Sequence, residues 1–448
     1  MKFIETLKNV WKITELKDRI LLTLGLLLVY RFGAQVVLPG IDAAQLEALA
    51  NNTNSGLLGL LNAFTGGAFA KASVFALGIM PYISASIVVQ LMGIAIPYLQ
   101  KLQKDGASGQ KKITQITRWL TIGICLVQAP GYLVSLPSLG IPKEAFLLGT
   151  GTMFYVSSVI ILVTGTVFAM WLGEKITDKG IGNGISLLIM VGIIARLPSS
   201  FVQNYASRME GGGNGGLMMI LIELVIWFVI ILLSIMLIMA VRKIAVQYAR
   251  RTASGGYEKN VFGSRQFLPL KLNASGVMPI IFAQAIMFVP GLIGKSFGTS
   301  DVGQWMQSQF SDIFGFWYNL VFALLIIIFT YFYTAITVPT NKMADDLKRS
   351  GGFIPGIRPG TETSEYLDKI MSQITLPGSI FLALIAVFPA IVVKLMSVQQ
   401  GWALFFGGTS LLILVGVAID TMQQVNSYLL NKHYDGLMKT GKNRKAVA

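Results

Sequence analysis

The sequence predicts an all-α protein that crosses a membrane many times, and three observations support this. The chain has 448 residues, 54% of them hydrophobic, and its mean hydropathy is +0.65. Only 13% of its residues are charged, whereas soluble proteins carry about 25%. Apolar stretches of about 20 residues, long enough to span a bilayer as a helix, recur along the whole chain. Lipid should therefore cover much of its surface.

Ten such stretches, each bounded by charges or by glycine and proline, are the predicted spans. In chain order they cover residues 20–38, 72–96, 119–139, 153–173, 181–202, 217–241, 274–294, 316–338, 374–394 and 403–424. Arg196 and Pro198 interrupt the end of the fifth. Residues 1–19 precede the first as an amphipathic segment predicted to lie on the membrane surface, and residues 425–448 form a polar tail.

The distribution of positive charge predicts which side of the membrane each loop faces. An even number of spans places both termini on one side. If that side is the cytoplasm, 29 of the 36 Lys and Arg residues lie in cytoplasmic segments, as the positive-inside rule requires. We therefore predict a multi-pass protein with both termini in the cytoplasm. The surplus charge either only sets this topology or also docks a polyanion such as ribosomal RNA.

Two predicted cytoplasmic loops, residues 242–273 and 339–373, are much longer than the about 2–8 residues that usually connect bundled helices. Both combine turn-forming residues with apolar ones, which favours ordered projections. The external segment 203–216 is rich in glycine and is predicted to be a hinge. It would separate an N-terminal half, residues 20–203, from a C-terminal half, residues 217–424.

The residue inventory argues against a metal site, a cofactor and catalysis. Cys125 and His433 are the sole cysteine and histidine of the sequence, and zinc needs three or four ligands of the His, Cys or carboxylate type. The glycines of segment 180–184 superficially resemble a nucleotide-binding loop, but no predicted strand precedes them. We therefore predict that the protein is not an enzyme and holds neither cofactor nor metal.

Three charged residues, Arg31, Glu223 and Asp420, fall within predicted spans. Charge at membrane depth often marks an ion or proton path. Here the three are spread over the first, sixth and last spans, which makes a poor relay. We favour the alternative, a buried pair or a side chain that reaches the membrane surface.

Glycine and proline interrupt two predicted spans, at Gly78–Pro81 and at Gly276–Pro279. Proline removes a helix hydrogen bond, so each helix should bend or unwind there. The breaks are either harmless kinks or the wall of a central cavity. Segment 56–67 is apolar but too short to span a membrane, so it is either an interfacial helix or a re-entrant plug.

Five blocks spread along the chain resemble the SecY/Sec61-alpha family. They are TGGAFAKASVFALGIMPYISASIVVQL (65–91), WLGEKITDKGIGNGIS (171–186), LPLKLNASGVMPIIFA (268–283), ADDLKRSGGFIPGIRPG (344–360) and FGGTSLLILVGVAID (406–420). The resemblance implies ten spans in two inverted, pseudo-symmetric halves around an hourglass pore. It also implies export of unfolded polypeptides across the bacterial plasma (inner) membrane and lateral release of transmembrane segments into lipid.

The same resemblance implies the residues of the pore. Its waist would be a ring of six isoleucines, Ile79, Ile83, Ile185, Ile189, Ile281 and Ile413. Segment 56–67 would be the plug, with Gly56, Leu57, Leu58, Leu60, Leu61, Phe64, Gly66 and Gly67. A lateral gate would lie between spans two and three on one side and spans seven and eight on the other. Branched apolar side chains offer water and ions no hydrogen bonds, so such a ring should resist leakage.

The resemblance also implies partners. Arg358, Arg250 and Arg251 would contact the SecA motor ATPase and the ribosome, including its RNA and proteins. SecE-like and SecG-like membrane subunits, preproteins that bear signal peptides, and the lipid bilayer complete the set. A secondary transporter is the main rival, but its broken helices would need coordinating polar groups, and isoleucines stand beside these breaks. An intramembrane enzyme ranks last because no catalytic pair falls within the spans.

Overall fold

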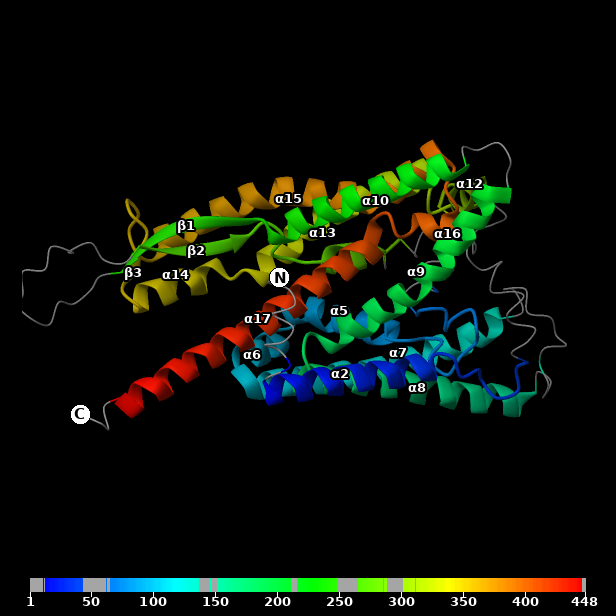
Figure 1. Ribbon diagram of the computed structural model, residues 1–448, viewed down its shortest axis with the longest axis horizontal. Coiled ribbons are helices and arrows are strands. Elements are labelled where there is room, and N and C mark those ends of the chain that lie inside the picture. Colours follow the sequence, from blue (N-terminus) through cyan, green and yellow to red (C-terminus); the bar gives the residue numbers. More distant parts are fainter. Residues whose placement is uncertain are drawn as a thin grey trace, which may run out of the picture. The chain divides into compact units, whose positions relative to one another are not determined.

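The computed structural model (Figure 1) divides into two compact units, which are described separately. It describes residues 11, 13–42, 62, 65–136, 146, 151–210, 216–248, 265–284, 286–287, 301–310 and 312–444. Unit 1 comprises Met1–Glu210, Gln399–Leu404 and Ile413–Ala448, and unit 2 comprises Gly211–Val398 and Phe405–Leu412. The first boundary follows Glu210, inside the glycine-rich segment 203–216.

Unit 1 consists of helices packed side by side. They are α2 (Thr14–Gly33), α5 (Met80–Ala95), α6 (Pro97–Lys104), α7 (Gly106–Ser135), α8 (Thr152–Lys179), α9 (Gly184–Glu210), α16 (Gln400–Ala403) and most of α17 (Gly408–Arg444). Helix α8 packs against α2, α7 and α9 (Figure 1). Leu133 and Leu162 lie in the core between α7 and α8, so one face of each helix is buried while the other faces outward.

Residues 65–79, which we call the stem, run as consecutive turns before α5 begins. The stem lies along the end of α2, because Val74 donates its amide to Val36 and Leu38 donates its amide to Ala72, each at 2.9 Å. Helix α5 then starts at Met80 with Pro81 in its first turn. Amides in the first turn have no partner within the helix, so a proline there costs no hydrogen bond. The break predicted at Gly78–Pro81 is therefore an unwound segment that ends in a new helix.

Unit 2 combines helices with short strands. Its elements are α10 (Gly216–Met239), β1 (Val241–Tyr248), β2 (Arg265–Lys271), α12 (Asp301–Phe310), α13 (Phe316–Thr337), α14 (Thr340–Arg349), β3 (Gly352–Phe353) and α15 (Thr361–Met396). Residues 278–284 are also helical. Helices α13 and α15 pack along each other, and Ile326 and Leu382 lie in the core that they share.

A three-stranded antiparallel sheet in unit 2 corrects the all-α prediction in this region. Its strand order is β2-β1-β3, and Ile244 of β1 lies opposite Leu268 of β2. Ile244 and Val246 alternate with more exposed neighbours and pack in a core with Leu347 and Leu367. The strands were missed because a half-buried alternation this short is a weak signal beside twenty-residue apolar runs. Both long loops contain ordered structure, as predicted: β1 and β2 lie in the first, and α14, β3 and the start of α15 lie in the second.

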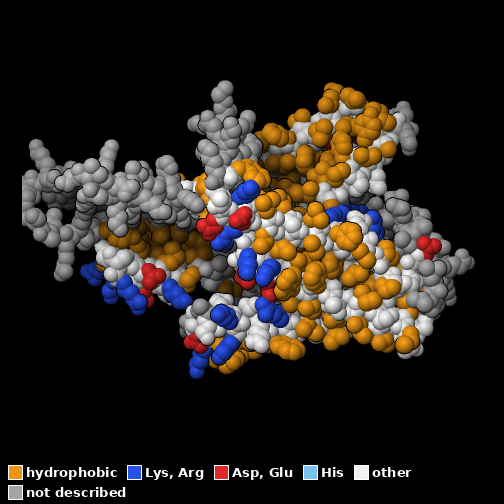
Figure 2. All heavy atoms as spheres, turned by 60° about the horizontal axis from the view of Figure 1, so that its bottom comes forward, with side chains coloured by type: hydrophobic (Ala, Val, Ile, Leu, Met, Phe, Trp, Pro, Cys, Tyr) orange, Lys and Arg blue, Asp and Glu red, His pale blue; other side chains and the backbone are white. Residues whose placement is uncertain are grey.

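Within the part of the chain that the structure describes, six helices are long and apolar enough to cross a membrane, and the bent pair α5 and α6 would add a seventh. Helix α9 continues to Glu210, so Pro198 does not end the fifth span. The six hydrophobic windows are only 22% to 50% buried. On the face shown in Figure 2, hydrophobic side chains accordingly cover broad areas with few charges among them, as a lipid-facing surface requires. The full count of ten spans stays a prediction.

Candidate functional site

The stem is wedged among four helices of unit 1. From α7, the hydroxyl of Tyr132 donates to the carbonyl of Phe69 at 2.7 Å. From α8, the backbone at Gly165 lies so close to the carbonyl of Val74 that a Cβ would not fit. Helices α2 and α9 both approach the first turn of the stem, at Gly66. The stem is thus fixed by contacts that are far apart in the sequence.

Gly66 is the most constrained point of the stem. Its φ is +65°, in the left-handed region that glycine tolerates. The Nη1 of Arg31 on α2 donates to the Gly66 carbonyl at 2.9 Å. A Cβ built on Gly66 would lie only 2.8 Å from the Cα of Gly192 on α9. Both the backbone conformation and the close packing therefore require glycine at this position.

Two buried polar side chains complete the start of the stem. The Oδ1 of Asn62 accepts the amide of Ala70 at 3.1 Å, and the Oγ1 of Thr65 accepts the amide of Phe69 at 3.1 Å. The exposed fractions of Asn62 and Thr65 are only 1% and 3%. A buried amide without a partner costs stability, so these side chains make the irregular backbone tolerable inside the protein.

The structure describes all six isoleucines of the predicted ring. Ile79 ends the stem and caps α5, and Ile83 follows one turn later. Ile185 and Ile189 lie one turn apart on α9, and Gly192 continues the same face by another turn. The stem therefore meets α9 one turn from a predicted ring position. Ile413 is buried on α17 in unit 1, whereas Ile281 lies in the helical residues of unit 2.

The glycine-rich loop 180–184 binds protein side chains with its amides. Ile181 donates to the Oγ1 of Thr23 at 3.1 Å, and Gly182 donates to the Oε1 of Gln424 at 2.8 Å. Gly184 donates to the Oγ1 of Thr177 at 2.9 Å. A phosphate-binding loop needs such N–H groups free for its ligand. Here they instead tie α8 to α2 and to α17.

Arg358 extends from a backbone that is well held. It lies between β3 and α15, and the Oγ1 of Thr363 donates to its carbonyl at 2.8 Å. Its side chain is 88% exposed, and its Nη1 lies 3.9 Å from the Oε1 of Glu362. Exposed ion pairs of this kind contribute little stability. An ordered turn therefore presents the guanidinium to solvent.

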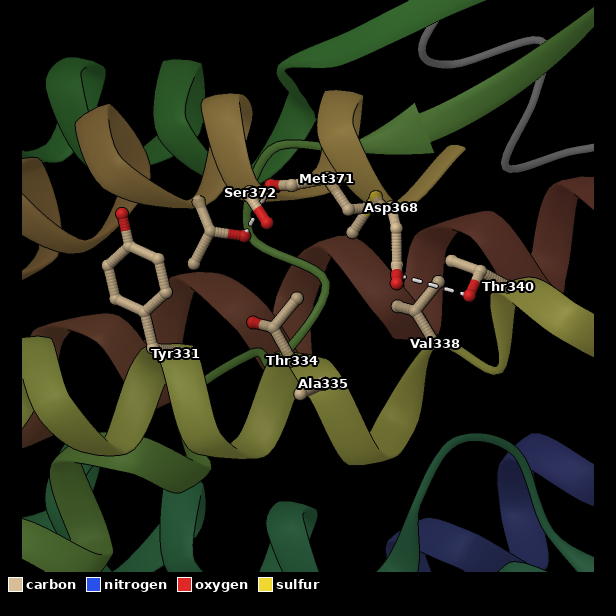
Figure 3. A pocket seen from close by; sticks show the side chains of 9 residues that line it. Tyr331, Thr334, Ala335, Val338, Thr340, Asp368, Met371 and Ser372 are labelled. Carbon is tan, nitrogen blue, oxygen red and sulfur yellow. Dashed lines mark hydrogen bonds between the residues drawn. The ribbon is translucent and has the colours of Figure 1, made fainter. Parts of the chain in front are cut away.

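A pocket of about 80 Å³ opens between α13 and α15 at the end of the predicted eighth span. Figure 3 shows Tyr331, Thr334 and Ala335 of α13 on one side and Asp368, Met371 and Ser372 of α15 on the other. The Oγ1 of Thr340 donates to Asp368 at 3.1 Å. This pocket is remote in sequence from both proline breaks. Among the described residues, no group of three or more His, Cys, Asp or Glu side chains could hold a metal ion.

Comparison with known proteins decides the family. The SecY family model matches residues 73–422. The protein translocase subunit SecY of Haemophilus influenzae is 41% identical over 427 residues, which cover 95% of this chain and 94% of that relative. The chain belongs to the SecY family. The protein translocase subunit SecY of Bacillus subtilis is 39% identical, and the match covers 97% of this chain and 99% of that relative.

Solved structures have the same fold as this SecY-family chain. One described as a protein-conducting channel has a TM-score of 0.60 and 16% identity, with 91% of each chain covered. The canine Sec61 of a ribosome-channel complex has a TM-score of 0.55 and 16% identity, again with 91% of each chain covered. Identities this low show the fold alone. They confirm the predicted class, a helical multi-span membrane protein of the SecY/Sec61 type.

Some predicted site residues of this SecY-family chain lie outside the described residues: Gly56, Leu57, Leu58, Leu60, Leu61 and Phe64 of the predicted plug, and Arg250 and Arg251. Gly66 and Gly67, at the end of the plug segment, are described. Sequence reasoning missed Asn62, Thr65 and Tyr132. Two features of the sequence pointed to the stem, the predicted break at Gly78–Pro81 and the charge of Arg31 in the first span. That side chain binds a backbone carbonyl, a partner that the sequence does not reveal.

Proposed function

We propose that this chain is the central protein-conducting channel of a Sec translocase. It exports unfolded polypeptides across the plasma membrane and releases transmembrane segments sideways into lipid. The observation that carries the proposal is identity of 41% over 95% of the chain with a protein named as a translocase subunit. The chain supplies the pathway rather than chemistry, so it acts without a cofactor and not as an enzyme.

In this proposal, Ile79, Ile83, Ile185, Ile189, Ile281 and Ile413 form the constriction. β-branched side chains are stiff, and an apolar constriction excludes water and hydrated ions by dewetting. A translocating peptide pushes the ring apart, and the side chains then close around the peptide as a seal. Support comes from unit 1, where the stem that carries Ile79 packs on α9 one turn from Ile189.

Segment 56–67 acts as the plug on one side of this ring. One structural relative, with a TM-score of 0.57 and 16% identity, is described as a SecY protein whose plug domain stabilises the closed state and maintains a membrane seal. The described end of the segment, Gly66 and Gly67, belongs to the stem, and Gly66 contacts α2 and α9. The lateral gate lies between spans two and three and spans seven and eight, and hydrophobic segments leave through it into lipid.

The chain resides in the bacterial inner membrane with both termini in the cytoplasm. The distribution of its Lys and Arg residues supports this orientation. The N-terminal half would comprise residues 20–203 and the C-terminal half residues 217–424. Loops 242–273 and 339–373 would then project into the cytoplasm.

Energy for transport must come from partners, which we propose to be the SecA motor ATPase and the ribosome. Two structural relatives are described within ribosome complexes, a canine Sec61 and a yeast Ssh1 complex. Arg358 is the best-placed described contact, with Arg250 and Arg251 as further candidates. SecE-like and SecG-like subunits would accompany the chain in lipid, and preproteins with signal peptides are its cargo.

The ring is tested by replacing Ile83 and Ile281 together with serine. Serine hydroxyls hydrate the constriction, so ion leak through vesicles that hold the full chain should rise. Each 1.4 kcal/mol removed from the barrier gives about a tenfold faster passage, and we expect an increase of at least this size. The matched control replaces Val88 and Ile286 with serine, because Val88 is exposed on the same helix as Ile83 and Ile286 is exposed just beyond Ile281. Equal leak from the ring variant and this control would refute the ring.

The rival transporter function makes a different prediction. A transporter binds a solute or ion at polar groups beside its broken helices. The pocket in Figure 3 instead lies beside Val338 and Thr340, where α13 ends. Stoichiometric binding of a small solute by the purified chain would favour the transporter, and vesicle leak confined to the ring variants favours the channel.

A further inference from the structure

Arg31 lies within the first predicted span and is partly buried on α2. A charged side chain at membrane depth is costly unless it finds a polar partner. The partner given by the structure is the Gly66 carbonyl, 35 residues away along the chain and 2.9 Å from Nη1. Hydrogen bonds from a charged donor are roughly twice as strong as neutral ones. This one joins α2 to the first turn of the stem.

The Gly66 carbonyl is available because nearby side chains replace the helical hydrogen-bond pattern. In a continuous helix, the amide of Ala70 would donate to the carbonyl of Gly66, four residues earlier. Here Ala70 donates to the Oδ1 of Asn62 instead, at 3.1 Å. Gly67 likewise donates its amide to the Asn62 carbonyl at 2.9 Å. The chain thus leaves one carbonyl free at the point where the guanidinium arrives.

The same glycine touches the helix that carries two predicted ring positions. A methyl group on Gly66 would lie 2.7 Å from the Nη1 of Arg31 and 2.8 Å from the Cα of Gly192. Gly66 is therefore packed closely against both the guanidinium and the backbone of α9. Gly192 lies one turn beyond Ile189 on that helix. All these residues belong to unit 1.

We propose that Arg31 is a positioning residue of the pore. Its guanidinium holds Gly66 against α9 and so fixes the stem that leads to Ile79 and Ile83. The inference rests on the proposed function, since it takes these isoleucines as part of the constriction. Without the hydrogen bond, the stem separates from α9 and the resting constriction admits ions.

The first test measures ion leak from vesicles that hold full-length Arg31→Met. Loss of a charged hydrogen bond shifts an equilibrium between two states by about tenfold or more, and the leak should rise accordingly. Arg31→Lys keeps the charge and should restore much of the seal. Arg19→Met, which removes a partly buried arginine paired with Glu15 on the same helix, should leave the leak unchanged. A leak at the parent level in Arg31→Met overturns the proposal.

A second pair of variants separates the contact from backbone strain. Gly66→Ala and Gly67→Ala both force alanine into the left-handed region, at φ +65° and +92°. A Cβ at Gly67 meets nothing within 4 Å, so only Gly66→Ala should reproduce the leak of Arg31→Met. The double variant Arg31→Met with Gly66→Ala should leak no more than the leakier single variant. If the leak of the double variant rises by the product of the two single-variant increases, Arg31 acts elsewhere than at Gly66, and the proposal is overturned.

Amide hydrogen exchange tests the anchor without reference to conduction. The amides of Gly67 and Ala70 should exchange faster in Arg31→Met than in the parent or in Arg19→Met, because both lie in the turn that Arg31 holds. Unchanged protection would contradict the anchor. If the ring variant at Ile83 and Ile281 fails to leak, the proposed function falls, and this measurement still decides whether Arg31 holds the stem.

Discussion

At the scale of single residues, Arg358 is an exposed cation on an ordered turn, and we propose that it contacts a partner. Its backbone is fixed by Thr363, and Gly360, with a φ of +118°, turns the chain into α15. Its guanidinium remains 88% exposed and has only a long contact with Glu362. Exposed pairs contribute little to stability, so this guanidinium has little role in folding. The turn itself is ordered by Ile354 and Ile357, which pack in the core with Leu347.

Reversing this charge should therefore affect partner binding rather than the channel itself. A lost charged hydrogen bond costs about 1.5–3 kcal/mol, so Arg358→Glu should weaken motor binding by about tenfold or more. Export of a preprotein driven by the motor ATPase should fall, while membrane insertion of the channel stays normal. Arg349→Glu, on the nearby exposed end of α14, is the matched charge reversal. Equal export by Arg358→Glu and the parent would remove Arg358 from the partner site.

At the scale of elements, α8 and α9 pack in unusually close contact. Gly184 at the start of α9 touches the carbonyl of Gly173 on α8, and a Cβ there would also lie 2.7 Å from the Cβ of Ile176. Small residues allow helix backbones to approach in this way. The crossing lies beside Ile185, whose Cγ1 would be 3.0 Å from a Cβ on Gly173. Close packing thus positions a predicted ring residue.

Alanine at Gly184 should force these two helices apart. Overpacking of this kind costs about 1–3 kcal/mol, so the thermal unfolding midpoint of the purified chain should fall. Gly123→Ala on α7 is the control, because a Cβ at that position meets nothing within 4 Å. Its higher helix propensity should leave stability equal or raise it by up to about 1 kcal/mol. A Gly184→Ala protein as stable as the parent would show that the crossing is loose.

The elements also show what the sequence could and could not predict. Span 316–338 was predicted almost to the residue of α13, Phe316–Thr337, because Gly315 and Pro339 punctuate both ends. Span 72–96 starts several residues before α5 does, although their ends agree. The reason is that the stem is as apolar as a membrane-spanning helix. Its turns depend on Asn62, Thr65 and the distant Arg31. Hydropathy carries no information about such long-range hydrogen bonds.

At the scale of the whole molecule, helix length indicates which parts leave the membrane. Helix α15 has 36 residues, which is about 54 Å at 1.5 Å per residue, whereas the hydrocarbon core is about 30 Å thick. Its first turns carry Glu362, Glu365 and Asp368, which cannot face hydrocarbon without high cost. Helix α17, with 37 residues, also exceeds the membrane thickness. In both helices, the residues beyond the membrane thickness fall in segments predicted to be cytoplasmic.

This orientation can be tested with single cysteines. Cys125 is buried, and Cys125→Ala removes it as a background label. Leu395, which is 77% exposed at the far end of α15, lies in a predicted external loop, and Lys348 on α14 lies in a predicted cytoplasmic one. In intact cells, an impermeant thiol reagent should label Leu395→Cys but label Lys348→Cys only after permeabilisation. The reverse pattern would invert the topology and place Arg358 on the side that neither the motor nor the ribosome can reach.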